Sequence, residues 1–175
     1  MPADKPNRKI AARKHRLAET IEILTELEFG PKQRNEIAAY TLLALLDLQP
    51  EAGWAESEAP LRGITPIIDF IATTYGVRYA PNTRETIRDD AVKFFVGEGL
   101  LMRNPDDFNR PTNSGKTAYQ IEPTALALLR KVRTSKWKSA LKKYLTSRES
   151  IKHEIVRKRN SARVPVTLPD GSKVA

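Results

Sequence analysis

The order of elements between Ile64 and Leu129 restricts the fold of this chain more than any other feature. Apolar spacing and turn residues there predict a helix, a short turn, a second helix, a two-stranded ribbon and a third helix. The predicted segments are 65–75, 82–98, 100–104 paired with 117–121, and a helix that begins at Pro123. This order is typical of a winged helix-turn-helix, a fold that can place one helix in a DNA major groove and a basic loop beside it.

Both helices of the pair carry start signals. Thr65 before Pro66 predicts an N-cap residue followed by a proline in the first helical position. Asn82, with Glu85 three residues later, predicts a capping box at the start of the second helix. The buried face of that second helix is expected to hold four apolar side chains, Ile87, Ala91, Phe94 and Phe95.

Further helices are predicted over 17–27, 33–48 and 137–159, and the last of these is strongly basic. The expected fold class is therefore mainly α with a small β-hairpin: a winged helix-turn-helix with extra N-terminal helices and a long basic C-terminal helix. Trp137 and Tyr144 lie at helical spacing, which favours core packing over base stacking.

We expect four parts along the chain. Residues 1–16 form a basic flexible arm, disordered or weakly helical, and residues 17–135 form the winged domain. Residues 136–163 form a basic helix or linker. Residues 164–175 contain a strand pattern followed by a turn at Asp170-Gly171, and we interpret them as the start of a truncated catalytic domain.

The net charge of +9 is unevenly distributed along the sequence. Residues 1–16 carry a net charge of +5 and residues 130–163 carry +11, whereas residues 17–129 carry −7. Basic segments attract polyanions through counterion release, and nucleic acid is the commonest such partner. A solvated helix that only aids solubility is the alternative explanation.

Composition and motifs exclude several other classes. The chain has no cysteine, no apolar run long enough to span a membrane and no secretory signal, so we expect a cytoplasmic protein without a membrane partner. Gly115-Lys116-Thr117 lacks the earlier glycine of a phosphate-binding loop, because position 110 is arginine. His15 and His153 are far apart, and no paired acids have the spacing of a nuclease centre. We therefore expect no catalytic centre, metal site or cofactor in these 175 residues.

Two polar segments are the candidate contacts with double-stranded DNA. Arginine pairs with guanine and asparagine with adenine, while a basic ribbon loop meets phosphates or enters a minor groove. The candidate residues are Asn82, Thr83, Arg84, Thr86 and Arg88 at the start of the second helix, and Arg103, Arg110, Asn113 and Lys116 in the ribbon. The alternatives are a hydrated amphipathic helix with only capping roles and an ordinary long hairpin loop. Asp89 and Asp90 argue against DNA contact by the second helix, since a row of phosphates repels carboxylates.

Long motifs in the same region resemble a known family. Ile64-Thr-Pro-Ile-Ile-Asp-Phe-Ile-Ala-Thr-Thr-Tyr-Gly76, Asn82-Thr-Arg-Glu-Thr-Ile-Arg88 and Arg110-Pro-Thr-Asn-Ser-Gly-Lys116 are similar to the N-terminal part of the BsuBI/PstI type II restriction endonucleases. Val164-Pro-Val-Thr-Leu-Pro-Asp-Gly171 resembles the start of that family's second half, so the resemblance runs from about Leu17 to the chain end.

The resemblance implies a helix-turn-helix domain of an enzyme that cuts palindromic DNA with magnesium. It implies DNA engagement by Asn82, Thr83, Arg84, Arg88, Arg110, Asn113 and Lys116. It also places the nuclease centre and its magnesium in a C-terminal half, which we expect to be missing here. The alternatives are an interaction module that forms a homodimer or docks on a catalytic domain, and a complete small nuclease.

Overall fold

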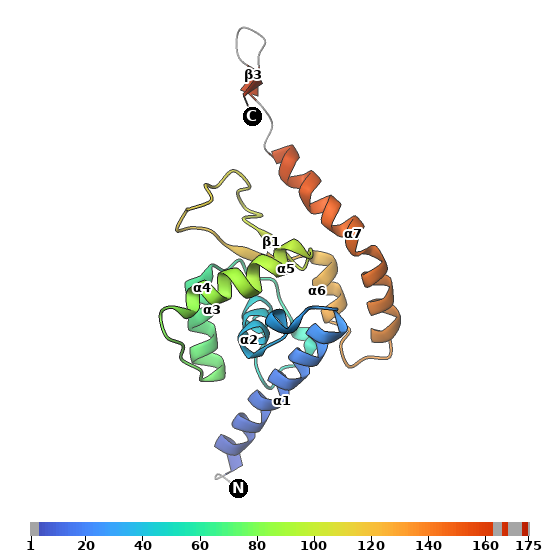
Figure 1. The fold of residues 1–175 in the computed structure, drawn as a ribbon. Coiled ribbons are helices and arrows are strands. Elements are labelled where there is room, and N and C mark those ends of the chain that lie inside the picture. Colours follow the sequence, from blue (N-terminus) through green and yellow to red (C-terminus); the bar gives the residue numbers. More distant parts are fainter. Residues whose placement is uncertain (1–3, 163–165, 168–172, 175) are drawn as a thin grey trace.

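The computed structural model describes residues 4–162, 166–167 and 173–174 of the chain (Figure 1). Its α-helices are α1 (Asp4–Glu26), α2 (Glu36–Leu45), α3 (Ile64–Phe70), α4 (Thr83–Thr86), α5 (Lys93–Gly97), α6 (Pro123–Leu129) and α7 (Trp137–Ala162). Its strands are β1 (Leu101–Arg103), β2 (Tyr119–Ile121), β3 (Val166–Thr167) and β4 (Lys173–Val174). Short 3-10 turns lie at Pro31–Gln33 and Trp54–Glu56. The predicted fold class is confirmed.

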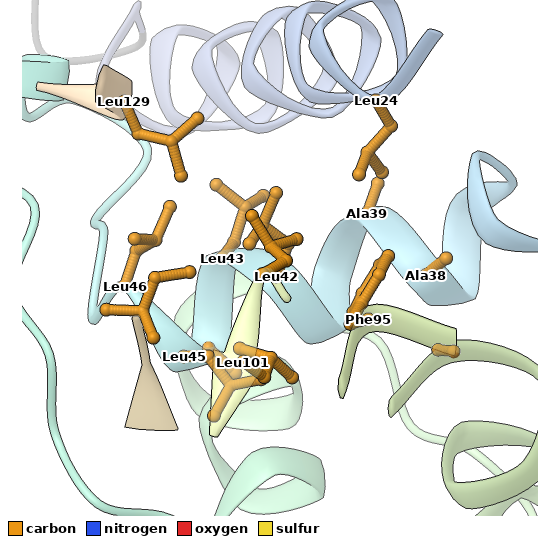
Figure 2. Close-up of a cluster of buried hydrophobic side chains, with 14 of the residues drawn as sticks. Leu24, Ala38, Ala39, Leu42, Leu43, Leu45, Leu46, Phe95, Leu101 and Leu129 are labelled. Carbon is orange, nitrogen blue, oxygen red and sulfur yellow. The ribbon is translucent and has the colours of Figure 1, made fainter. Parts of the chain in front are cut away.

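Helix α2 is the centre of the hydrophobic core. All its residues from Ala38 to Leu45 are buried, because α1, α6, β1 and the helix-turn-helix surround it. In Figure 2, Leu24, Phe95, Leu101 and Leu129 approach the side chains of α2 from different elements. The helix is shorter than the predicted 33–48, since the Asn35 side chain accepts a hydrogen bond from the Ala38 amide (3.0 Å) and caps the helix there.

Helix α1 is continuous from Asp4, so the structure differs from the disordered or weakly helical arm expected over 1–16. Basic side chains in this segment are held by tertiary contacts. Arg13 Nε donates to the carbonyl of Thr74 (3.1 Å). Arg16 is buried and donates to the carbonyls of Gln49 (3.3 Å) and Ala52. Part of the N-terminal positive charge therefore stabilises the fold.

The helix-turn-helix consists of two helices that each contain a π-helical segment. The first continues from α3 through Ile71–Tyr75 and ends at Gly76, whose φ of +73° is the left-handed conformation. The second runs from α4 through Ile87–Val92 into α5. We call this second helix, residues 83–97, the recognition helix.

The predicted N-cap at Thr65 is wrong, and Asn82 precedes the second helix as predicted but does not form the predicted capping box. The N-cap of α3 is Gly63, so Thr65 is the second residue of the helix and its hydroxyl has another partner, described below. Asn82 has helical φ and ψ angles and makes no side-chain cap bond. The turn before it supplies backbone acceptors instead, because the amides of Thr83 and Arg84 donate to the carbonyls of Ala80 (2.9 Å) and Pro81 (3.3 Å).

The π-helical segment also changes the buried face of the recognition helix. Ile87, Ala91 and Phe95 are buried as predicted, but Phe94 is 46% exposed and Val92 is buried in its place. A π turn closes over five residues instead of four, so Ile87 and Val92 come to lie on the same side. The predicted position of Phe94 in the core is wrong for this reason.

The ribbon and the last two helices close the core. Strands β1 and β2 are antiparallel, with Leu101 opposite Ile121 and Arg103 opposite Tyr119. Glu122 caps α6 by accepting from the Ala125 amide (2.9 Å). Tyr144 of α7 is buried, which confirms its predicted place in the core. Strand β3 pairs with β4, whereas the predicted turn at Asp170-Gly171 lies outside the described residues.

Among the described residues, no helix combines the length and the apolar character that spanning a bilayer requires.

Gly76 offers a test of the turn between the paired helices. We expect Gly76→Ala to lower the free energy of unfolding by about 1–2 kcal/mol, because alanine is strained at positive φ. The new Cβ would also lie 2.7 Å from Arg13 Nη1 and displace that guanidinium. Gly97→Ala is the control, since nothing lies within 4 Å of its Cβ position. Urea unfolding followed by circular dichroism measures both variants, and equal stabilities would contradict the prediction.

Candidate nucleic-acid interface

The N-terminal end of the recognition helix faces outward. Asn82, Arg84 and Arg88 are exposed, while Thr83 and Thr86 are half-buried. Ile87 on the opposite side is fully buried and anchors this end of the helix. The predicted orientation is therefore correct: the polar end is available to a partner and the apolar side forms core.

A groove of about 250 Å³ separates the recognition helix from the ribbon loop, residues 104–118, which we call the wing. Arg84 and Arg88 line one wall, and Arg103 of β1 and Asn113 of the wing line the other. Thr65 at the start of α3 lies at one end of the groove. Tertiary structure thus brings together four of the nine predicted contact residues, from segments almost 30 positions apart in sequence.

Local hydrogen bonds orient the three arginines of this groove. Arg84 Nη1 donates to Thr65 Oγ1 (2.6 Å), and Arg103 Nη2 donates to the carbonyl of Thr112 in the wing (3.0 Å). Arg88 Nε donates to Asp89 Oδ1 (3.3 Å). A guanidinium has five N–H donors, so each arginine keeps donors that can pair with a guanine edge or a phosphate.

Hydrogen bonds within the wing hold the Arg110 side chain. It donates to Asp106 Oδ2 (2.7 Å) and to Asn104 Oδ1 (2.8 Å). The buried Asn104, at φ +49°, also accepts from the Ala118 amide (2.9 Å) at the opposite end of the wing. The Arg110 hydrogen bond lowers the pKa of the Asp106 carboxyl. These contacts close the base of the wing and occupy much of the Arg110 guanidinium.

The remaining predicted residues lie outside the groove walls. Lys116 is exposed in the wing, and its backbone amide donates to Ser114 Oγ (3.1 Å). Thr86 lies two positions from both Arg84 and Arg88, so it points to another side of the helix. Asn82 and Thr83 precede the groove at the start of the helix.

Sequence reasoning missed Lys93 and Tyr119. Both line a second hollow of about 430 Å³ between the recognition helix and the wing, and this hollow shares Arg88 and Arg103 with the first. Burial raises the pKa of Tyr119, so the phenol is neutral at ordinary pH. Lys93 follows Asp89 by four positions on the helix, a spacing that was available in the sequence as a sign that both share one face.

A metal ion held by protein side chains is commonly bound by a cluster of carboxylates, histidines or cysteines. Within the described ranges, no group of three or more histidine, cysteine, aspartate or glutamate residues is arranged to hold one.

The fold and the groove define a winged helix-turn-helix domain. The profile of the BsuBI/PstI restriction endonuclease HTH domain matches residues 14–153, and the chain belongs to this family. It is 38% identical over 156 residues to "Type II restriction enzyme BsuBI" of Bacillus subtilis, covering 89% of this chain and 49% of that enzyme. It is 33% identical over 159 residues to "Type II restriction enzyme AplI" of Arthrospira platensis, covering 91% and 49% respectively.

A solved structure shares the architecture. The structure of SdaI restriction endonuclease is similar with a TM-score of 0.73 and 28% sequence identity, over 90% of this chain and 50% of that one. The chain thus spans about half the length of the curated relatives and of the solved structure that it matches.

Proposed function

We propose that this chain is the DNA-binding domain of a type II restriction endonuclease. The recognition helix enters the major groove with its N-terminal end, and the wing lies against the adjacent backbone. The observation that carries the proposal is the shared groove, in which exposed arginines of the helix, Arg84 and Arg88, face Arg103 of the ribbon.

Each part of the surface has a distinct role in this proposal. Arg84 and Arg88 read base edges, where arginine pairs with O6 and N7 of guanine. Arg103 and Asn113 contact phosphates from the other side of the groove, and Lys116 contacts phosphates from the exposed part of the wing. Arg110 shapes the wing through Asp106 and Asn104 and contributes little direct contact. The Arg88–Asp89 pair reduces the repulsion that Asp89 exerts on a phosphate.

The proposal gives this chain DNA binding and not DNA cleavage. Because the matched restriction enzymes are about twice as long as the matched region, we propose that hydrolysis and its magnesium ion belong to a catalytic half outside these 175 residues. A homodimer, which the sequence analysis gives only as an alternative, and a cytoplasmic location, which it gives as an expectation, stay predictions.

Binding to duplex DNA at several salt concentrations tests the proposal. We expect log affinity to fall by about 0.9 per phosphate contact for each tenfold rise in salt, so three or more contacts give a slope of about −3 or steeper. Selection from a random duplex library should also enrich a short common sequence. A chain that binds no duplex at low salt, or that binds with no salt dependence, would overturn the proposed function.

A further inference from the structure

The groove between the recognition helix and the wing continues as far as α7. A third hollow, of about 80 Å³, shares Arg103 and Thr112 with the two described above, and shares Val96 with the second. Its far wall consists of Ile155 and Arg159, in the last two turns of α7. Since adjoining hollows share these side chains, one surface track runs from α3 past the wing to the end of α7.

The track is strongly cationic along its whole length. Six cationic side chains and a single carboxylate line the three hollows: Arg84, Arg88, Lys93, Arg103, Arg110 and Arg159, with Asp89 as the acid. Asp89 is paired with Arg88, and Arg110 is paired with Asp106. In the part of the chain whose side chains are described, Lys93 and Arg159 have no ion-pair or hydrogen-bond partner, so both charges are available to an anion.

Helix α7 is fixed against the end of the recognition helix. Glu98 Oε2 lies 3.9 Å from Arg148 Nη1 and 3.7 Å from Lys152 Nζ of α7. A Cβ on Gly99, at φ +79°, would lie only 2.9 Å from Lys152 Cγ, so the two backbones approach closely there. The position of Arg159 beside the wing is therefore set by packing two turns earlier in the same helix.

We propose that Arg159 binds a phosphodiester of the DNA backbone, and that the end of α7 is a third element of the DNA interface beside the recognition helix and the wing. This inference rests on the proposed function. A strand whose phosphates pass between Arg88 and Arg103 reaches Lys93 and then Arg159 along the same track. The basic helix thereby links the DNA-facing surface to the segment that follows it in the chain.

Arg159 is well separated from Lys142 and Lys143 of the same helix. Lys143 lines a different hollow, against Thr124 and Leu128 of α6, and Lys142 lines none of the three hollows of the track. At 1.5 Å per residue, Lys142 lies about 25 Å along the helix axis from Arg159. Lys142→Gln is therefore a matched control, because it removes the same charge from the same helix away from the track.

Duplex affinities of the 175-residue chain with Arg159→Gln and with Lys142→Gln test the proposal. We expect the first substitution to reduce the salt slope by about 0.9 and to weaken binding about eightfold at roughly 0.1 M salt, while the second leaves both within error. Loss of one phosphate contact changes all sequences alike, so the preference among duplexes should stay unchanged. Equal behaviour of the two variants would overturn the inference.

A proximity probe gives an independent reading. The chain has no cysteine, so Val156→Cys and Lys142→Cys each provide one attachment site for a DNA-cleaving iron chelate. We expect strand cleavage from position 156, which is 42% exposed and one turn before Arg159, and none from position 142. If the parent chain binds and Arg84→Ala weakens it, but position 156 cuts nothing, only the α7 contact is wrong. If the parent chain fails to bind, the proposed function is wrong.

Discussion

Replacing Arg84 and Arg88 together by alanine is expected to weaken binding of the selected duplex by roughly 2–6 kcal/mol, since each arginine that reads a base contributes roughly 1–3 kcal/mol. Both side chains are exposed on the groove wall and keep unused guanidinium donors. Truncation removes these donors without disturbing the core, because the buried face of this helix is carried by Ile87, Ala91 and Phe95.

Competition between the selected duplex and random duplex measures the effect. Loss of base reading should reduce affinity for the selected sequence far more than for random DNA. The paired substitution Lys138→Ala with Lys142→Ala removes two charges from exposed positions at the start of α7 and should preserve the preference. Equal losses on both duplexes would show that the two arginines contact only phosphate, and unchanged binding would remove the recognition helix from the interface.

The sequence was sufficient for the order of elements but not for their ends. Apolar spacing placed the paired helices, the ribbon and α7, because each has a face that the core buries. Thr65 is not an N-cap because α3 begins earlier, with Gly63 as its N-cap residue. Asn82 makes no side-chain cap bond, and backbone carbonyls of the preceding turn accept from the amides of Thr83 and Arg84 instead. Phe94 was misplaced because no periodicity rule for α-helices anticipates a π-helical segment.

The residues of the candidate site were likewise only partly predictable from the sequence. Arg84, Arg88, Arg103 and Asn113 were identified from residue type and position in a winged helix, and the fold brings all four to one groove. The structural role of Arg110 depends on a wing conformation in which Asn104 adopts positive φ, and Arg159 depends on the packing of α7 beside Glu98. Both are tertiary properties that residue spacing does not encode.

Removing the buried carboxylate of Glu19 is expected to cause the largest loss of stability. Glu19 in α1 is 7% exposed and joins three separate segments. Its Oε1 accepts from Trp54 Nε1 (2.5 Å), its Oε2 accepts from Arg133 Nε (2.5 Å), and Arg16 Nε lies 3.3 Å from Oε1. Glutamine has one acceptor oxygen and one NH₂ donor, so in Glu19→Gln the NH₂ group faces one of these N–H donors and cannot accept from it. The buried Arg16 also loses its counter-charge.

We expect Glu19→Gln to lower the free energy of unfolding by roughly 2–4 kcal/mol at neutral pH, because it leaves a buried donor and a buried charge unsatisfied. The exposed Arg133 contributes only a screened part of this loss. Glu26→Gln, an exposed position on the same helix, is the control and should change stability by less than about 0.5 kcal/mol. Urea unfolding by circular dichroism compares both variants with the parent chain.

The pH dependence of this difference separates charge from packing. Burial alone raises the pKa of Glu19, but the hydrogen bonds from Trp54 and Arg133 outweigh it and hold the pKa below its ordinary value of 4.5. A carboxyl whose pKa is lower in the folded state stabilises above its unfolded pKa and loses that contribution as pH falls through its folded pKa. The gap between the parent chain and Glu19→Gln should therefore be constant near neutral pH and shrink below pH 4.5. A gap that stays constant down to about pH 3 would assign the loss to packing rather than to the charge of Glu19.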